Sequence, residues 1–372
     1  MSLIVDDRRP ADVLEALDGP GPVVVVDHRR VPPDDLARRL DHAPPGTWLV
    51  ALTSGSTAEP RAVCRTRDSW QVSVAALAEV TGVGPGTRVL VPGPLASTLF
   101  LHAAWHARQA GAEPVIAPLT TRQHWDVAHL VPRQLSGLLS GDVDLSGRTV
   151  VAGGAALPAA LASRAAERGL AVVTYYGAAE LSFVAVRAPD STSEGMAAFP
   201  GVEVSCREGL VWARGPLLAT GYLPDASGHR ATAGALRHDI DGWASVGDRG
   251  RMLADGSVVI TSRGEDAVQS GGATIDVAEV EAVLSQAPDV TDVVVLAVPH
   301  SDLGHVVGAV VERAGPADPQ SVRTMRGWAR DRLAPEALPR RWHLTPALPR
   351  TAGGKVDRIA ARALLAPADA PD

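Results

Sequence analysis

The sequence has only two cysteines and no excess of positive charge. Cys64 and Cys206 are far apart and form no C-x-x-C pair, which gives no support to a disulfide framework or a zinc knuckle. The formal net charge is -7, and no basic stripe offsets it, which argues against nucleic acid or an anionic membrane as a partner. The N-terminus becomes charged at once and has no apolar stretch long enough for a signal peptide or a membrane span. We therefore expect a cytoplasmic protein.

The composition is that of a soluble globular protein, with 46% hydrophobic and 21% charged residues in a chain of 372. This length is sufficient for a sizeable core and about two domains. Apolar, β-branched runs predict buried strands at 23–27, 48–52, 89–93, 149–153 and 171–177. Helical patterns at 68–80, opening on an Asp68 cap, and at 159–168 lie between these runs. The alternation predicts a layered α/β fold with partly parallel sheets.

The pattern changes after about residue 200. Short runs separated by glycine and aspartate predict antiparallel strands, with a hairpin turn at 254–257. The last part of the chain predicts helices at 277–285 and 322–333 and strands at 292–299, 305–313 and 341–345. We place a boundary near Asp266, which divides the chain into a large domain, 1–265, and a small α+β domain, 266–372.

One polar stretch, "LTSGSTAEPRAV" at 52–63, gathers hydroxyl side chains around Gly55. We expect it to follow a buried strand and precede a helix, which would direct backbone N–H groups toward phosphate oxygens. It is not a Walker loop, because G-x-x-x-x-G-K-[ST] fits nowhere in the chain. An ordinary turn rich in serine and threonine remains the alternative from this stretch alone.

Six further segments, in order, make the stretch more specific. They are "GGAALP" (153–158), "YYGAAE" (175–180), "GLVWARGPLLATGYL" (209–223), "WASVGDRGRM" (243–252), "SRGEDAVQSGGATIDVAEVE" (262–281) and "LPRTAGGKVDR" (348–358). Together the seven resemble the core motifs of the adenylate-forming superfamily, which includes acyl-CoA synthetases, peptide-synthetase adenylation domains and luciferases. The resemblance covers about residues 47–362.

The resemblance implies a two-step reaction. A carboxylate attacks the α-phosphate of ATP to give an acyl-adenylate and pyrophosphate, and a thiol, usually of coenzyme A, then displaces AMP. An acyl carrier protein is an alternative acceptor. The small domain of such enzymes rotates between the steps, and the hinge position falls on Asp266. Oligomerisation is left open.

The resemblance also implies roles for single residues. Lys355 would reach the α-phosphate and the carboxylate, Glu180 would hold Mg²⁺, and Arg263 would lie near the ribose and phosphate. Without the motifs, Lys355 would be interpreted as a solvated lysine and Arg263 as part of a surface ion pair. Tyr176 would stack on adenine, or be a core tyrosine, and Asp248 would accept the ribose hydroxyls, or be a turn residue.

The remaining implied residues surround these. The nucleotide would also contact Thr53, Ser54, Gly55, Ser56, Thr57, Arg61, Gly154, Ala155 and Gly177. Gly271 and Gly272 would line the coenzyme A tunnel, although a plain β-turn fits them as well. An acyl pocket suited to an aliphatic or aryl acid would be lined by Leu95, Phe100, His102, Trp105 and Ala178.

Alternatives remain open for the residues of the predicted acyl pocket and for the reaction. The wall residues could belong to the core, and His102 with His106, spaced i, i+4, could bind a metal, although no H-E-x-x-H pattern is present. The family motifs have other residues at five positions, which here are Ala58, Arg61, Ala62, Ala179 and Gln269. These differences leave room for a slow enzyme, for an acceptor other than coenzyme A, or for a protein that only binds a nucleotide or acyl-adenylate.

Overall fold

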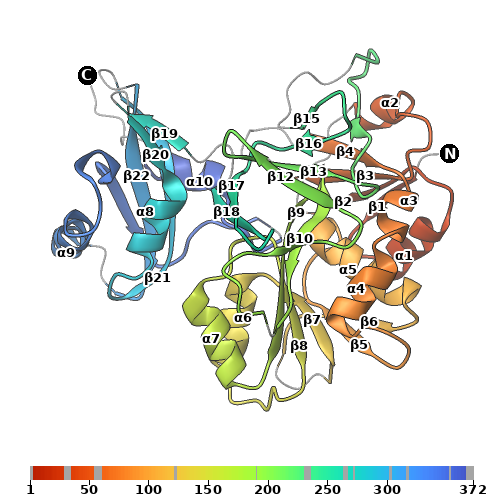
Figure 1. Ribbon diagram of the computed structural model, residues 1–372, viewed down its shortest axis with the longest axis horizontal. Coiled ribbons are helices and arrows are strands. Elements are labelled where there is room, and N and C mark those ends of the chain that lie inside the picture. Colours follow the sequence, from red (N-terminus) through yellow and green to blue (C-terminus); the bar gives the residue numbers. More distant parts are fainter. Residues whose placement is uncertain are drawn as a thin grey trace.

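The computed structural model describes residues 3–28, 35–53, 61–120, 124–189, 191–229, 236–262, 267–270, 273–300, 304–315, 318–351 and 353–365. Its elements form a large N-terminal part and a smaller C-terminal part that lies beside it (Figure 1). The predicted fold class is confirmed: the large part is layered α/β with mixed sheets, and the small part is α+β.

The first sheet contains β1 (Leu3–Asp6), β2 (Val23–Val26), β3 (Leu49–Thr53), β4 (Arg61–Arg65) and β14 (Gly221–Tyr222), in that order. Strands β1, β2 and β3 are parallel, whereas β4 is antiparallel to β3 and pairs Arg61 with Thr53. The polar stretch at 52–63 therefore connects two strands of a hairpin. The predicted strand–loop–helix order is wrong at this point, because β4 comes before the next helix.

The second sheet supplies most of the core. Its order is β11 (Ala197–Ala198), β10 (Ser182–Arg187), β9 (Ala171–Ala178), β8 (Thr149–Ala152), β7 (Val127–Leu130), β5 (Arg88–Val91) and β6 (Glu113–Ile116). Strands β6, β5, β7, β8 and β9 are parallel. Their carboxyl ends therefore lie along one edge of the sheet, where open α/β folds place their ligands.

Helices cover both faces of this sheet (Figure 1). Helix α5 (Thr98–Gln109) packs on one face, and α6 (Pro132–Leu139) and α7 (Ala159–Glu167) pack on the other. The remaining helices of the large part are α1 (Pro10–Asp18), α2 (Leu36–Leu40), α3 (Asp68–Gln71) and α4 (Val74–Thr81). β-Branched residues fill both faces of the central strands because both faces are buried.

The helix predicted at 68–80 is interrupted. The backbone N–H of Ser73 donates to the carbonyl of Trp70 at 3.0 Å, a tighter i to i-3 bond, and the Ser73 hydroxyl donates to the same carbonyl at 2.7 Å. This turn separates α3 from α4. Asp68 is the first residue of α3 and makes no side-chain cap bond, so the predicted cap is also wrong.

The third sheet is formed by short antiparallel strands. It contains β15 (Arg237–His238), β16 (Ala244–Ser245), β13 (Leu210–Arg214), β17 (Arg249–Met252) and β18 (Val258–Ser262), with β12 (Glu203–Arg207) paired to β13. The turn between β17 and β18 has Gly256 at φ +82°, which confirms the predicted hairpin.

The C-terminal part has its own sheet and two core clusters. The strands are β20 (Ala273–Asp276), β19 (Ala267–Ser270), β22 (Gly304–Arg313), β21 (Val290–His300) and β23 (Arg341–Thr345). Helices α8 (Val277–Leu284) and α9 (Pro319–Arg330) cover one face, and α10 (Arg358–Ala363) packs on the other. A 3-10 turn, η1 (Pro335–Ala337), precedes β23. Asp266 lies outside the described residues, so the predicted boundary and hinge stay predictions.

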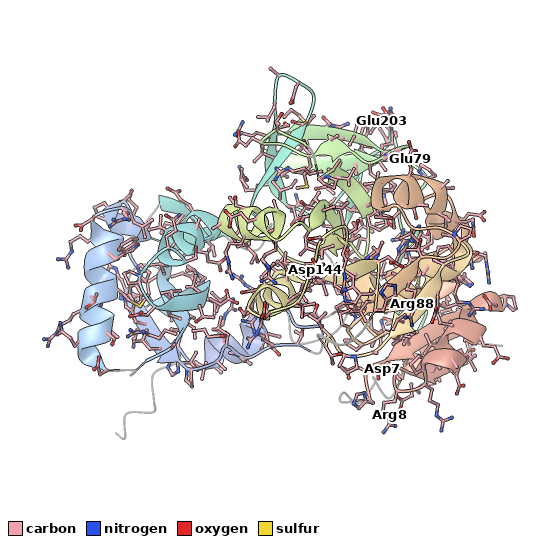
Figure 2. All side chains as sticks on the ribbon, turned by 90° about the horizontal axis from the view of Figure 1, so that it is seen from below. Asp7, Arg8, Glu79, Arg88, Asp144 and Glu203 are labelled. Atoms are coloured by element: carbon pink, nitrogen blue, oxygen red, sulfur yellow. The ribbon has the colours of Figure 1, made fainter. Side chains whose placement is uncertain are left out.

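Charged side chains project from the outer surface, as Arg8 and Glu203 do at opposite edges of Figure 2, with side chains 67% and 60% exposed. Each has a partner, Arg8 with Asp6 at 2.6 Å and Glu203 with Arg214 at 2.7 Å. Such exposed pairs contribute little to stability. Among the described residues, no helix is both long and apolar enough to span a bilayer.

Candidate active site

A pocket of about 80 Å³ lies at the carboxyl edge of the second sheet. The lining side chains and backbone come from β4, α3, α5, β7, the end of β8, the β9–β10 hairpin and the C-terminal part. They are Arg65, Trp70, Thr98, Leu99, His102, His129, Gly154, Tyr175, Gly177, Ala178, Ala179, Ser182, Phe183 and Lys355. Segments almost 300 residues apart in the sequence therefore meet around one space.

Lys355 is the residue that the C-terminal part contributes to this pocket. A tight loop presents it: the N–H of Thr351 donates to the Lys355 carbonyl at 2.8 Å, and the N–H of Gly354 donates to the Thr351 carbonyl at 2.9 Å. The side chain crosses to the large part and packs on Gly154, where an added Cβ would lie 2.9 Å from Lys355 Cε. The structure thus brings two predicted site residues, Lys355 and Gly154, into contact.

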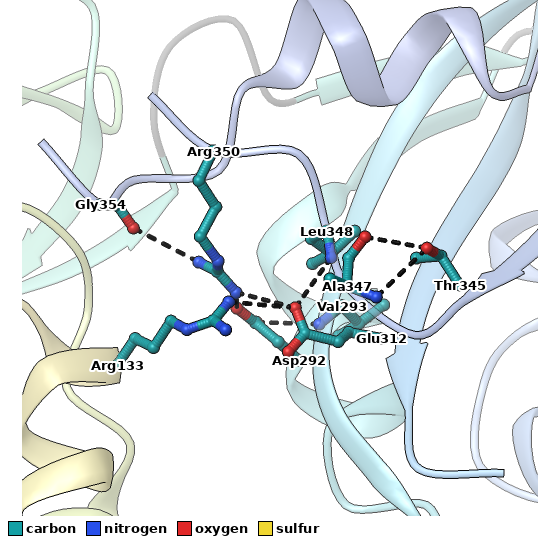
Figure 3. A network of polar contacts seen from close by, with 9 residues as sticks. All are labelled: Arg133, Asp292, Val293, Glu312, Thr345, Ala347, Leu348, Arg350 and Gly354. Carbon is teal, nitrogen blue, oxygen red and sulfur yellow. Dashed lines mark hydrogen bonds and ion pairs between the residues drawn. The ribbon is translucent and has the colours of Figure 1, made fainter. Parts of the chain in front are cut away.

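A network of charges supports the loop that carries Lys355 (Figure 3). Arg350 pairs with Asp292 at 2.5 Å and with Glu312 at 3.1 Å, and it donates to the Gly354 carbonyl at 3.4 Å. Glu312, which is buried, also pairs with Arg133 of α6 at 3.3 Å. Since Arg133 belongs to the large part, this ion pair connects the Lys355 loop to the large part.

Glu180 lies just after β9 and is buried. Its carboxylate accepts a hydrogen bond from the Tyr222 hydroxyl at 2.9 Å. Burial and the Glu180 charge raise the pKa of Tyr222 to about 12, so this hydroxyl remains a donor at neutral pH. The Glu180 carboxylate can also bind a second partner, because a carboxylate can accept several hydrogen bonds or bind a cation.

A buried arginine, Arg65, holds the backbone next to Glu180. Its guanidinium donates to the carbonyls of Ala179 and Leu217. Burial lowers the pKa of Arg65 to about 10, and the nearby Glu180 charge opposes that shift, so the guanidinium remains charged at neutral pH. Neither Arg65 nor Tyr222 was predicted as a site residue from the sequence. The available signal was an arginine at the end of a run of buried residues in β4.

Tyr176 and Asp248 form a second pair of predicted site residues. The Tyr176 hydroxyl donates to Asp248 Oδ2 at 2.8 Å, and both residues are buried. Tyr176 lies in β9, whereas Asp248 comes just before β17, so the bond connects the second and third sheets. Gly177 has a structural reason to be glycine, since an added Cβ would lie 2.0 Å from the Ser182 carbonyl oxygen in the facing strand.

Several predicted residues lie outside what the structure describes. They are Ser54, Gly55, Ser56, Thr57, Ala58, Arg263, Asp266, Gly271 and Gly272. Of Thr53 only the backbone is described, at the end of β3, and Arg61 begins β4 opposite it. Ala155 is exposed in the segment after β8. The proposed roles of these residues stay predictions.

The predicted acyl wall needs correction. His102 and Ala178 line the pocket, but Leu95, Phe100 and Trp105 are at most 1% exposed and belong to the hydrophobic core. The physical reason is that α5 is buried on nearly every side from Phe100 to Ala107. The side chains that line the pocket beside His102 and Ala178 include Trp70, Leu99, Tyr175 and Phe183.

The two histidines of α5 are buried, and aromatic rings surround His102. The rings of His102 and His106 stack with centroids 6.0 Å apart, and burial lowers the pKa of both. His106 Nε2 lies 3.1 Å from the Val74 carbonyl. Within the described ranges, the group of side chains with metal-ligand spacing is Asp6, Asp7 and His28, far from α5 in the sequence. The metal interpretation of the α5 pair gains no support.

Comparison with known families agrees with this arrangement. The model of the AMP-binding enzyme family matches residues 12–223, and the model of its C-terminal domain matches residues 279–355. The first match covers more than half of the chain. The chain belongs to the family of AMP-binding enzymes. The two matches include the pocket residues of both parts, from Arg65 to Phe183 in the large part and Lys355 in the C-terminal part.

Individual AMP-binding enzymes resemble this one over most of its length. A 2-succinylbenzoate–CoA ligase from Salmonella typhimurium is 31% identical over 319 residues, 84% of this chain and 67% of that protein. The structure of E. coli MenE with bound OSB-AMS has a TM-score of 0.81 at 25% identity, covering 97% of this chain and 87% of that one. The amide bond synthetase McbA from Marinactinospora thermotolerans has a TM-score of 0.73 at 28% identity, covering 97% and 79%.

Proposed function

We propose that this AMP-binding enzyme activates a carboxylic acid with ATP, through an acyl-adenylate, and transfers the acyl group to the thiol of coenzyme A. The observation that carries the proposal is the place of Lys355 in the pocket beside the β9–β10 hairpin. Lys355 is also the only lysine in the chain, and all the other residues counted as Lys or Arg are arginines. A compact ammonium with three donors is therefore kept at this one point.

In the first step, a carboxylate oxygen attacks the α-phosphorus of ATP. A bond forms between the carboxylate oxygen and the α-phosphorus, and the bond from the α-phosphorus to the bridging oxygen of the leaving pyrophosphate breaks. Negative charge grows on the phosphoryl oxygens, and catalysis depends mainly on positive charge and oriented dipoles at that place. Lys355 would supply the charge, and the ion pairs of Figure 3 would hold its loop against the large part.

The nucleotide would lie across the carboxyl ends of the second sheet. Tyr176 offers a ring face to adenine, while its hydroxyl fixes Asp248 for the ribose hydroxyls. Backbone around Gly154, Ala155 and Gly177 would complete this side. The phosphates would meet the stretch from Thr53 to Thr57 together with Arg61 and Arg263.

The residues around Glu180 fit a magnesium ion. One or two carboxylates with phosphate oxygens is the usual Mg²⁺ environment, and Glu180 is a buried carboxylate fixed by Tyr222. Bound Mg²⁺ would neutralise phosphate charge. Arg65 keeps the backbone before Glu180 in place and balances its charge within the protein.

For the acceptor of the acyl group in the second step, there is a specific alternative to coenzyme A. Gly271 and Gly272 are the predicted tunnel residues for coenzyme A, and a carrier-protein thiol would use the same approach. McbA, which is similar over 97% of this chain, is an amide bond synthetase, so an amine is a second candidate acceptor. The differences at Ala58, Arg61, Ala179 and Gln269 also keep a nucleotide-binding protein without turnover as an outcome of the test.

The test is pyrophosphate release across a panel of carboxylic acids, with coenzyme A, with a panel of amines, and with no acceptor. We expect acid-dependent release that turns over repeatedly only when coenzyme A is present. Turnover with amines alone would move the second step to amide formation. No release with any acid would leave a protein that binds nucleotide without activating an acid.

A further inference from the structure

Two buried histidines, His102 and His129, line the pocket. His102 lies on α5 and His129 on β7, and their side chains belong to residues only 5% and 2% exposed. Arg65, 1% exposed, lines the same pocket. Each has one buried nitrogen without a hydrogen-bond partner among the described residues: His102 Nδ1, His129 Nε2 and Arg65 Nε. Leaving such groups unpaired is costly, so a bound group that pairs with them is favoured.

We propose that the acid activated by this enzyme is a compact aromatic acid that carries a neutral hydroxyl group, and that His102 and His129 recognise this hydroxyl. The inference rests on the proposed function and names the substrate class of that same site.

The hydrogen bonds of Ser73 determine which His102 nitrogen carries the proton. The single hydroxyl hydrogen of Ser73 is donated to the Trp70 carbonyl at 2.7 Å. Ser73 Oγ therefore accepts from His102 Nε2, which lies 3.3 Å away. A neutral imidazole has one donor and one acceptor nitrogen, so Nδ1 of His102 carries a lone pair. The partner that this atom lacks is a hydrogen-bond donor.

The other two unpaired nitrogens complement this acceptor. Arg65 Nε carries a hydrogen, so it can only donate, and His129 Nε2 donates in the tautomer of the neutral ring that holds its proton there. A hydroxyl group both donates and accepts, which lets it bind a lone pair on one side and an N–H group on the other. A carbonyl could only accept, and it would leave His102 Nδ1 unpaired.

The charges around the pocket favour a neutral group. Burial lowers the pKa of His129 to about 3 and places that of His102 well below its usual range, and the Arg65 charge lowers the latter further. Both rings are therefore neutral at physiological pH. An ammonium would be repelled by Arg65, while a second carboxylate would lose its hydration and find the Arg65 terminal nitrogens already bonded to Ala179 and Leu217.

Aromatic rings form the sides of this part of the pocket. The His102 ring lies 4.8 Å from Trp70 and 4.9 Å from Phe183, both edge to face, and Phe183 lies 4.8 Å from Tyr175 in the same way. Such walls suit a flat aromatic group. The volume of about 80 Å³ suits a small acid better than a long acyl chain.

The test compares matched acids in pyrophosphate release: hydroxybenzoates and hydroxycinnamates, their unsubstituted and methyl-ether counterparts, and aromatic dicarboxylates. We expect the best hydroxylated acid to exceed its unsubstituted counterpart in kcat/KM by at least about tenfold, because unpaired site groups penalise the analogue that lacks the hydroxyl. In His102→Phe that ratio should fall to within about threefold of one. His106→Gln, one helical turn away and outside the pocket lining, should keep the ratio.

The outcomes separate the two proposals. The hydroxyl assignment would be overturned if the native enzyme had an equal or higher kcat/KM with unsubstituted acids, methyl ethers or dicarboxylates. The proposal of acid activation would then still stand. A ratio that survives in His102→Phe would also overturn it. If that variant does not fold, the acid preference of the native enzyme decides. No release with any acid would overturn both proposals.

Discussion

Lys355 Cε lies against Gly154, 2.9 Å from the point where a β-carbon on that glycine would be. Gly154 has φ +84°, a conformation that favours glycine, and follows β8 at the carboxyl edge of the second sheet. The contact joins the C-terminal part to the large part at the pocket. The absence of a side chain at residue 154 therefore makes room for the lysine.

Gly154→Ala should displace Lys355 and slow the first step. We expect pyrophosphate release to fall by at least about tenfold, since small displacements of positioned groups cost that much or more. The matched control is Gly147→Ala, at φ +71° with no atom within 4 Å of the new methyl group. Both variants should lose about 1 kcal/mol of unfolding free energy from backbone strain, but only Gly154→Ala should lose activity. Equal activity in the two variants would contradict the role of the contact.

Lys355→Ala should separate the two half-reactions. We expect acid-dependent pyrophosphate exchange to fall by at least about a hundredfold, as when one charge-stabilising donor is removed. Transfer of coenzyme A from preformed acyl-adenylate should remain largely intact. Equal loss of both steps would reject the assignment of Lys355 to adenylation alone.

The single lysine also permits a test on the native chain. An amine-reactive reagent can modify only Lys355 and the N-terminal amine. We expect modification to stop pyrophosphate exchange, and ATP with acid to protect against it. Peptide mapping of the modified protein would show whether protection follows Lys355. Full activity after complete modification of Lys355 would contradict its role.

Arg133 should contribute through its ion pair with Glu312, at 3.3 Å between the two parts (Figure 3). The Arg133 side chain is 50% exposed, so we expect Arg133→Ala to slow pyrophosphate release by about two- to fivefold, and salt to weaken the native enzyme in the same direction. Arg88→Ala is the control, because Arg88 is similarly exposed and pairs at 3.1 Å with Glu113 inside the large part. An equal effect in both variants would remove the link to the Lys355 loop.

The sequence was sufficient to predict elements whose local pattern agrees with their surroundings. The run at 149–153 contains the buried strand β8, the run at 171–177 is strand β9, in which Val173 and Tyr176 are buried, and the helix predicted at 277–285 is α8. The β-branched residues of these strands and the periodic apolar residues of the helix face the core, as their sequence patterns predict. Lys355 and Glu180 could be predicted because their motifs are local, and Lys355 lies in the pocket beside the β9–β10 hairpin, while the roles of both residues stay predictions.

The rest depends on contacts between distant segments. Helix α5 is buried on nearly every side, so periodicity could not separate His102, which faces the pocket, from Trp105, which faces the core. Arg65 was missed because its partners, the carbonyls of Ala179 and Leu217, are 114 and 152 residues away. Neither relationship has a local signature. The break between α3 and α4 is local by contrast, because it depends on hydrogen bonds from Ser73 to the Trp70 carbonyl three residues earlier, but the helical pattern at 68–80 gives no sign of it.

The buried His129 should make stability fall in acid. Burial lowers its pKa from 6.5 to about 3, so below pH 6.5 the unfolded chain binds a proton that the folded chain does not. The unfolded state then holds more protons, and stability decreases as pH falls from about 6.5 toward 3. Near pH 5.5 the loss from this one group is on the order of 1 kcal/mol.

His129→Gln should therefore flatten the dependence of unfolding free energy on pH in this range, whatever its effect at pH 8. His124→Gln is the matched control, because the His124 side chain is 68% exposed and its removal should leave the slope unchanged. Urea unfolding at pH 8, 6.5 and 5.5 measures both. His102 and His106 are buried with lowered pKa values as well, so part of the slope should remain in His129→Gln. A slope identical to that of the native chain would show that folding does not lower the pKa of His129.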